Sequence, residues 1–335
     1  MDVAAFCDES RVLVVAGKGG VGKTTVSATL AWTAAAAGLS VLVVELEGKP
    51  GLHTAFGGDG PLRYAESFLL PLDRPVAPPG TGPEAPPGTV RARHITPDDA
   101  LLEYLAEHGL HRVSKRLVSS GIVDVVSTAI PGIRDILVLG KVKQLERGGA
   151  ADLIVVDAPA TGHAVTFLTS ASGLLDAARG GPVRAQAADV VELLTDAARC
   201  RVLLVTLPEE MPVSETVEAA YQLEDRAGVR LGPVVVNGFD VPPAGLERPA
   251  VEAAAADGIQ LSSAHLAAIE EARTFRLRRH ELQAAQVRRL ADELPLPQLP
   301  LPQLFSATIG PPQLEMLSGA LGRGIEALVP GAPAT

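Results

Sequence analysis

The strongest chemical signal in the chain is a glycine-rich loop near its N-terminus. The loop, GKGGVGKTT at residues 17–25, follows a short apolar run and precedes an alanine-rich stretch typical of a helix. Its spacing fits GxxxxGK(S/T), in which backbone N–H groups and the positive end of a helix dipole bind phosphate oxygens. We expect Lys23 to reach the β- and γ-phosphates and the Thr24 hydroxyl to ligate Mg²⁺. The predicted nucleotide-binding residues are Gly17, Gly19, Gly20, Val21, Gly22, Lys23, Thr24 and Thr25.

Two further apolar runs end in carboxylates that would complete a site for nucleotide hydrolysis. Asp157 follows the run LIVV and takes the place of the Mg²⁺-side aspartate, which we expect to act on the ion through water. Hydrolysis also needs a group that orients the attacking water. Glu45 and Glu47 follow the run VLVV, and their spacing alone does not decide which of them has this role.

The elements that must position these residues alternate between strand and helix. Apolar runs suited to buried parallel strands occur at Val12–Ala16, Val41–Val44, Leu153–Val156, Val202–Thr206 and Val234–Val236. With helical patterns between them, they predict an α/β fold with a mostly parallel central sheet flanked by helices. Together with the phosphate-binding loop, this is the fold of a P-loop NTPase, which we expect to form one domain over residues 1–335.

Other stretches depart from this alternation. Residues 96–147 and 166–198 have helical patterns and predict a helical subdomain beside the sheet, and residues 262–292 predict a further helix. Residues 61–89 are rich in Pro and Gly and predict a flexible surface loop with no strand or helix. Residues 294–305, LPLPQLPLPQLF, predict an edge strand with proline-rich turns.

Composition limits the class of protein. The 335 residues are 47% hydrophobic, enough for a large core, and their formal net charge of −10 argues against nucleic-acid binding. Cys7 and Cys200 are too few for a disulfide framework or a four-ligand zinc site, so we expect neither zinc nor an iron–sulfur cluster. The N-terminus lacks the pattern of a signal peptide, and Gly38 divides the apolar stretch 28–44 into pieces too short to cross a bilayer. We therefore expect a cytoplasmic protein without stable membrane insertion.

Several motifs, in the same order, resemble one family of ATPases. The loop at 17–25 resembles the deviant Walker A loop, and DAPATGHAVTFL at 157–168 resembles the switch II segment of ATPases that drive arsenite pumps or guide tail-anchored membrane proteins. AIPGIRDIL at 129–137, LPEEMPVSET at 207–216 and VVVNG at 234–238 are similar to three more segments of that family. The chain resembles an actinobacterial member of it.

This resemblance implies ATP and Mg²⁺ as cofactors and gives roles to particular residues. Lys18, the early lysine of the loop, would cross a dimer interface to the phosphates held by the other subunit. Lys18, Glu47 and Asp157 would form the catalytic set, and Asn237 would recognise adenine.

The resemblance also implies partners. The dimer would be either a homodimer or a heterodimer with a paralogous ATPase. The client would be a membrane protein or another protein, held by an apolar segment between helices. The apolar positions that could line such a groove, although an apolar helical stripe more often belongs to a buried core, are Val123, Val125, Val126, Ile130, Ile133, Ile136, Leu137 and Leu139.

The chain departs from the family in both switch segments. ELEGKPGLHTAF, residues 45–56, stands where the family has STDPAHNLSDAF, so Glu47 replaces the water-orienting aspartate. A catalytic group misplaced by about 1 Å can cost on the order of 100-fold in rate. Ala158, Pro159 and Ala160 alter switch II. Two functions follow: an active dimeric switch ATPase, or a weakly active nucleotide-binding subunit that regulates a paralogue. A third, attachment to membrane surfaces by the C-terminal helix, is disfavoured because Arg323 is its only basic residue.

Overall fold

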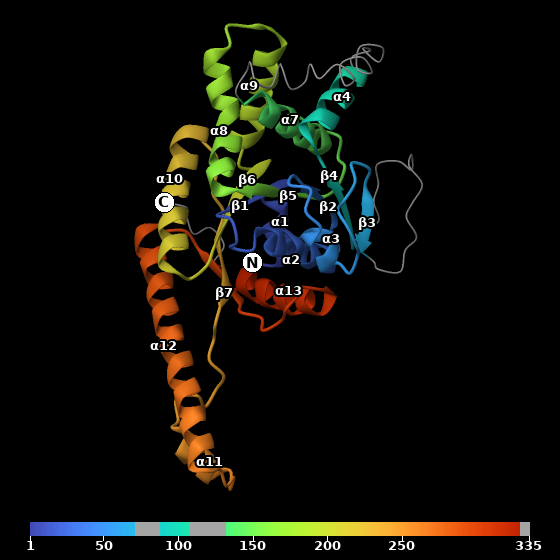
Figure 1. Ribbon diagram of the computed structural model, residues 1–335. Helices are drawn as coiled ribbons and strands as arrows, with labels where there is room; N and C mark the ends of the chain where they lie inside the picture. The colour runs from blue at the N-terminus through green and yellow to red at the C-terminus, as the bar shows by residue number, and fades with distance from the viewer. Residues whose placement is uncertain (71–87, 108–131, 329–335) are drawn as a thin grey trace.

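An eight-stranded sheet forms the centre of the protein. The computed structural model describes residues 1–70, 88–107 and 132–328 (Figure 1). The strand order is β3-β4-β2-β5-β1-β6-β7-β8, and all neighbours are parallel except β3 and β4. The strands are β1 (Val12–Gly17), β2 (Ser40–Glu45), β3 (Ser67–Leu70), β4 (Thr89–His94), β5 (Leu153–Ala160), β6 (Cys200–Thr206), β7 (Val234–Phe239) and β8 (Gln298–Pro302). The predicted P-loop NTPase fold is confirmed.

The five strands expected from apolar runs are all present. Their side chains are apolar on both faces because both faces of the sheet are covered by helices. In β1, Val12 and Val14 belong to one hydrophobic core, and Leu13 and Val15 belong to a second core on the other face. The predicted edge strand also exists: β8 closes one side of the sheet and carries two prolines, which an edge tolerates because it needs fewer backbone donors.

The prediction for residues 61–89 was wrong in part. Ser67–Leu70 form β3, an edge strand antiparallel to β4, while residues 71–87 lie outside the described ranges. β4 itself has the sequence TVRARH, whose arginines hide the apolar pattern. Two glutamates offset their charge: the Glu66 carboxylate lies 2.5 Å from Arg91 Nη1 and 3.8 Å from Arg93 Nη1, and that of Glu103 lies 3.9 Å from Arg93 Nη2. Charge partners supplied by the fold therefore make this strand possible.

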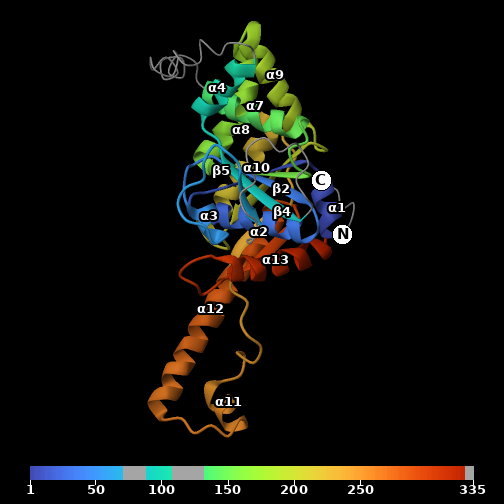
Figure 2. The same ribbon diagram turned by 90° about the vertical axis from the view of Figure 1, so that its right-hand side faces the viewer.

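One face of the sheet is covered by α2 (Lys23–Ala36) and α13 (Pro311–Glu326), with the short helices α1 (Val3–Asp8) and α3 (Gly51–Ala55) beside them (Figures 1 and 2). α2 follows the phosphate-binding loop and crosses under β1, β2 and β5. It is almost wholly buried, which agrees with its run of Ala and small polar residues. This packing holds the loop at the carboxyl end of β1, in the middle of the sheet.

The other face carries a layer of helices. They are α4 (Pro97–Glu107), α7 (Ile133–Arg147), α8 (Thr161–Ala177), α9 (Gly181–Thr195) and α10 (Glu210–Ala227). Of the apolar positions that suited a client groove, Ile136 and Leu139 are fully buried in the core, and Ile133 and Leu137 pack against it. Val123, Val125, Val126 and Ile130 lie outside the described residues. The described positions thus belong to the core.

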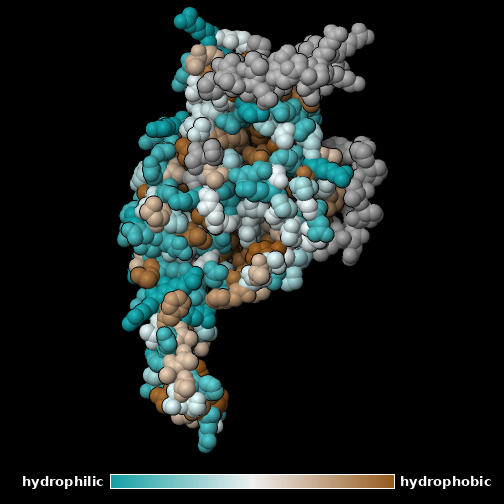
Figure 3. Space-filling view, in the orientation of Figure 1, coloured by the Kyte–Doolittle hydropathy of each residue, from teal (hydrophilic) through white to brown (hydrophobic). Residues whose placement is uncertain are grey.

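A long arm leaves the body between β7 and β8 (Figures 1 and 2). It consists of α11 (Ala250–Ala256) and α12 (Ser263–Glu293), and α12 confirms the helix expected at 262–292. Apolar side chains are exposed along the arm, among them Val251, Ile259, Phe275 and Leu282 (Figure 3). Only Gln283 and Leu290 of α12 are buried, so the arm is held to the body near its C-terminal end. Within the described ranges, no helix meets the length and hydropathy needed to span a bilayer.

Candidate functional site

The glycine-rich loop joins the end of β1 to the start of α2, as its sequence predicted. Gly20 and Gly22 have φ angles of +89° and +90°, which residues with a Cβ rarely adopt. A Cβ on Gly22 would also lie 2.2 Å from Asn237 Nδ2, and one on Gly17 would lie 2.4 Å from the Val205 carbonyl oxygen. The loop is therefore a close-packed backbone cradle of the kind that binds phosphate.

Asp157 lies beside this cradle near the end of β5, the strand that pairs with β1. Its carboxylate is buried and accepts hydrogen bonds from Thr24 Oγ1 (2.7 Å) and Ser27 Oγ (3.1 Å). Burial raises the pKa of Asp157 to about 6, although the two hydroxyl groups and the charge of Lys23 act in the opposite direction. The hydroxyl and carboxylate oxygens are ligands that Mg²⁺ prefers, so this donor set fits the ion.

Ser27 was not singled out by the sequence analysis. It lies four residues after Lys23, one helical turn along α2, and its hydroxyl is buried against Asp157. The i, i+4 spacing places both residues on the same side of the helix. That spacing was the available signal, but it indicates a partner only once β5 is known to lie beside α2.

Lys23 stays close to its own loop. Its Nζ donates a hydrogen bond to the Lys18 carbonyl oxygen at 3.3 Å, and the residue is only 9% exposed. Burial lowers the pKa of Lys23, while the negative charges of Asp157 and Glu47 act to raise it. The ammonium group thus lies within the electrostatic reach of both carboxylates.

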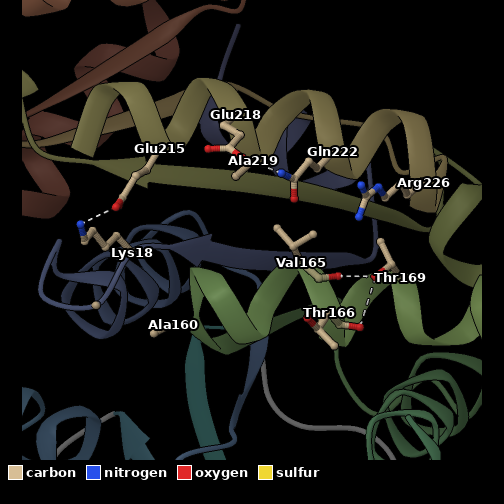
Figure 4. Close-up of a pocket in the computed structure, with 11 residues that line it drawn as sticks. Lys18, Ala160, Val165, Thr166, Thr169, Glu215, Glu218, Ala219, Gln222 and Arg226 are labelled. Atoms are coloured by element: carbon tan, nitrogen blue, oxygen red, sulfur yellow. Dashed lines mark hydrogen bonds and ion pairs between the residues drawn. The ribbon is translucent and has the colours of Figure 1, made fainter. Parts of the chain in front are cut away.

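Lys18 points toward Glu215 on α10 (Figure 4). Its Nζ lies 2.5 Å from Glu215 Oε1, and the two side chains are 42% and 32% exposed. The pair stands at one end of a pocket of about 390 Å³ between α8 and α10. Within the described chain, Lys18 is therefore held by an ion pair that the sequence did not predict, because Glu215 is 197 residues away.

The structure distinguishes Glu45 from Glu47 by their burial and their partners, which their spacing in the sequence could not do. Glu45 is buried and accepts hydrogen bonds from the backbone N–H groups of Glu47 (2.7 Å) and Gly48 (2.9 Å). Glu47 is partly exposed and forms an ion pair with Lys49. Burial alone would raise the pKa of Glu47, but Lys49, Lys23 and a backbone hydrogen bond from Ala160 outweigh it and lower the pKa. The lowered pKa keeps Glu47 ionised, and its hydrogen bond from Ala160 places it beside the switch II segment.

Asn237, at the end of β7, packs against the back of the loop. Its Nδ2 donates a hydrogen bond to the Val21 carbonyl oxygen at 2.9 Å. The loop, Asp157, Glu47 and Asn237 therefore gather around the carboxyl ends of parallel strands, where open α/β sheets bind their ligands. Such a cradle, with an oxygen donor set beside it, defines a P-loop NTPase site.

Comparison with known proteins agrees with this fold. Residues 12–272 match the family described as the CobQ/CobB/MinD/ParA nucleotide binding domain, and the chain belongs to this family. It is 38% identical over 234 residues to ATPase BagA of Mycobacterium tuberculosis, a match that covers 68% of this chain and 64% of that relative. It is 26% identical over 235 residues to the arsenical pump-driving ATPase of Escherichia coli, covering 69% and 35%. Over 157 residues it is 29% identical to ATPase get3 of Schizosaccharomyces japonicus, covering 47% and 42%. The resemblance noted in the sequence is confirmed.

Proposed function

We propose that this chain is a Mg²⁺-dependent ATPase that works as a dimeric switch. The observation that carries the proposal is the contact between the Thr24 hydroxyl and the buried Asp157 carboxylate, beside the glycine cradle. Mg²⁺ held there, with Asp157 acting through water, would neutralise charge on the β- and γ-phosphate oxygens of ATP. The names of the relatives, several of which are called ATPases, support hydrolysis.

Each residue of the site has a part in this proposal. The N–H groups of residues 17–25 bind the phosphates, and the Lys23 ammonium group holds the β- and γ-phosphates in place. Glu47 accepts a hydrogen bond from the attacking water, and its lowered pKa keeps it ionised for that task. Asn237, already fixed against the loop, contacts adenine with the rest of its amide group.

The dimer is proposed from Lys18. In the described chain the Lys18 ammonium group is partly exposed and bound to Glu215 on α10. Breaking this pair would free Lys18 to reach the phosphates of a second subunit. ATP binding would thereby favour association, and hydrolysis would release it. The second subunit is either another copy of the chain or a paralogous ATPase.

A second candidate is a weakly active regulatory subunit that supports a paralogue. It is favoured by the state of Glu47, whose longer carboxylate replaces an aspartate and is bound to Lys49. Lys49 thus competes with water for one oxygen of the Glu47 carboxylate. Turnover of the chain alone, compared with turnover beside its paralogue, distinguishes the two functions.

A role with arsenite is not proposed. Arsenite needs thiolates that converge on one site. Cys7 and Cys200 belong to the two different hydrophobic cores, on opposite faces of the sheet, and burial raises the pKa of each thiol to about 12. A protein client handled in the cytoplasm remains the proposal for the biological role.

The proposal is tested by phosphate release from ATP as Mg²⁺ is titrated. We expect turnover to require Mg²⁺, and Asp157→Asn to remove at least 100-fold of it, since the ion loses its negative partner. The exposed carboxylate Glu224 supplies the control variant, Glu224→Gln, which should match the wild type. Equal turnover of the Asp157→Asn variant would contradict the proposed site.

A further inference from the structure

Glu45 is a buried carboxylate that the proposed chemistry does not use. Glu45 is only 2% exposed. In the pairing of β2 with β5, it lies opposite Asp157. A carboxylate without solvent must be compensated by hydrogen bonds or by charge. Where Glu45 finds these partners shows what it does.

The first partners are the backbone N–H groups of the switch I loop. Glu45 Oε1 accepts from the N–H of Glu47 (2.7 Å) and from that of Lys49 (3.4 Å), and Oε2 accepts from that of Gly48 (2.9 Å). Gly48 has a φ angle of +69°, which lets three consecutive N–H groups point at one anion. The loop thus forms an anion-binding nest that is filled by the chain's own carboxylate.

The second partner is His94, the last residue of β4. Its Nδ1 lies 2.7 Å from Glu45 Oε2 and 3.1 Å from the Glu45 carbonyl oxygen. The strand register places His94 opposite Glu45, and the Ile95 N–H donates to the same carbonyl at 3.0 Å. Glu45 is therefore held from β4 on one side while it holds the switch I loop on the other.

We propose that Glu45 and His94 are positioning residues that set the place of Glu47. Of the three backbone N–H groups that Glu45 binds, that of Glu47 is the nearest, at 2.7 Å. In the pairing of β2 with β5, Glu45 also lies opposite Asp157. The pair therefore fixes the distance from the water-orienting carboxylate to the Mg²⁺ side of the site, without touching nucleotide. This inference rests on the proposed role of Glu47.

A double-mutant cycle of Glu45 and Glu47 tests by enzyme kinetics whether Glu45 acts through Glu47. Glu45→Gln keeps the size of the side chain but removes its charge and one acceptor, and Glu47→Gln removes the proposed water-orienting charge. We expect Glu45→Gln to lower kcat about 10- to 100-fold, as a misplaced catalytic group does, with the Kd for a fluorescent ATP analogue changed less than 2-fold. In the Glu47→Gln background, Glu45→Gln should cost nothing further, because it acts through Glu47.

His94 gives a second comparison. An Asn amide places a donor near the position of Nδ1, so His94→Asn should keep most of kcat, whereas His94→Leu should behave like Glu45→Gln. His265→Leu, on the exposed start of α12, is the matched control and should leave turnover unchanged.

Hydrogen exchange measured by mass spectrometry reads the loop without depending on turnover. The peptide that covers residues 46–52 should exchange at least 5-fold faster in the Glu45→Gln and His94→Leu variants, while peptides from β1 and α2 keep their wild-type rates. Unchanged exchange in that peptide would overturn the inference, as would losses of kcat that multiply in the double variant. Full turnover of Glu47→Gln would instead contradict the proposed function, and the exchange result would still decide whether Glu45 holds the loop.

Discussion

Removing the Glu215 carboxylate should strengthen the proposed ATP-dependent dimer. In the described chain, Glu215 holds Lys18 at 2.5 Å, and Lys18 must leave this ion pair before it can contact phosphates in a second subunit. The side chains are 42% and 32% exposed, and ion pairs this open to water contribute about 0.2–1 kcal/mol. Glu215→Gln should remove that cost from association.

The free-energy cost of breaking the Lys18–Glu215 ion pair doubles in a symmetric dimer, since one such pair must break in each subunit. About 0.4–2 kcal/mol corresponds to a dimer dissociation constant about 2- to 30-fold lower for Glu215→Gln. Sedimentation of the chain with Mg²⁺ and a non-hydrolysable ATP analogue measures this constant. For a heterodimer, one pair breaks and the expected gain is about 1.4- to 5-fold, measured with the paralogous subunit added.

Glu218 supplies the matched control because it lines the same pocket three residues further along α10. Glu218→Gln should leave the dissociation constant unchanged. The gain from Glu215→Gln should shrink at high ionic strength, where exposed charges are screened, and should vanish in the Lys18→Ala background. A Glu215→Gln dimer that is weaker than wild type, or a gain that persists without Lys18, would refute the reasoning.

Four further predictions follow from the structure. Gly22→Ala should abolish ATP binding in a fluorescence titration, because the loop's φ of +90° and the contact with Asn237 leave no room for a Cβ; retained affinity would contradict this. Ser27→Ala should lower the free energy of unfolding in urea by about 1.5–3 kcal/mol, because a hydrogen bond to a buried carboxylate is lost; no change would show that water replaces the hydroxyl. Burial raises the pKa of the Cys7 and Cys200 thiols to about 12, so a thiol reagent at pH 8 should label neither until urea unfolds the chain. The raised pKa values also predict that unfolding becomes easier as the pH rises from 9 toward 12, because only the unfolded thiols ionise there.

The sequence carried enough information for the strands whose side chains are apolar on both faces. The runs that became β1, β2, β5, β6 and β7 could be found because parallel strands buried between helices have few other compositions. β4 could not be found in this way, since its arginines are placed beside Glu66 and Glu103, which only the fold brings to them. β3 was hidden by the Pro- and Gly-rich stretch around it.

Within the site, local spacing revealed the phosphate-binding loop and Asp157 because each depends on its neighbours in sequence. The partners of Lys18 and Glu45 depend on contacts across the fold. Glu215 is brought to Lys18 by α10, and His94 is brought to Glu45 by the pairing of β4 with β2. The burial that distinguishes Glu45 from Glu47 is likewise a property of the folded switch I loop.

The most direct test of a dimeric switch ATPase is ATP turnover measured together with molecular mass in Mg·ATP, for the wild type, Lys18→Ala and Glu47→Ala. The account predicts that nucleotide produces a dimer that releases phosphate. It predicts that Lys18→Ala loses both dimer and turnover, and that Glu47→Ala keeps the dimer but loses turnover. A wild-type monomer that turns over ATP as fast as its Lys18→Ala variant would contradict the account.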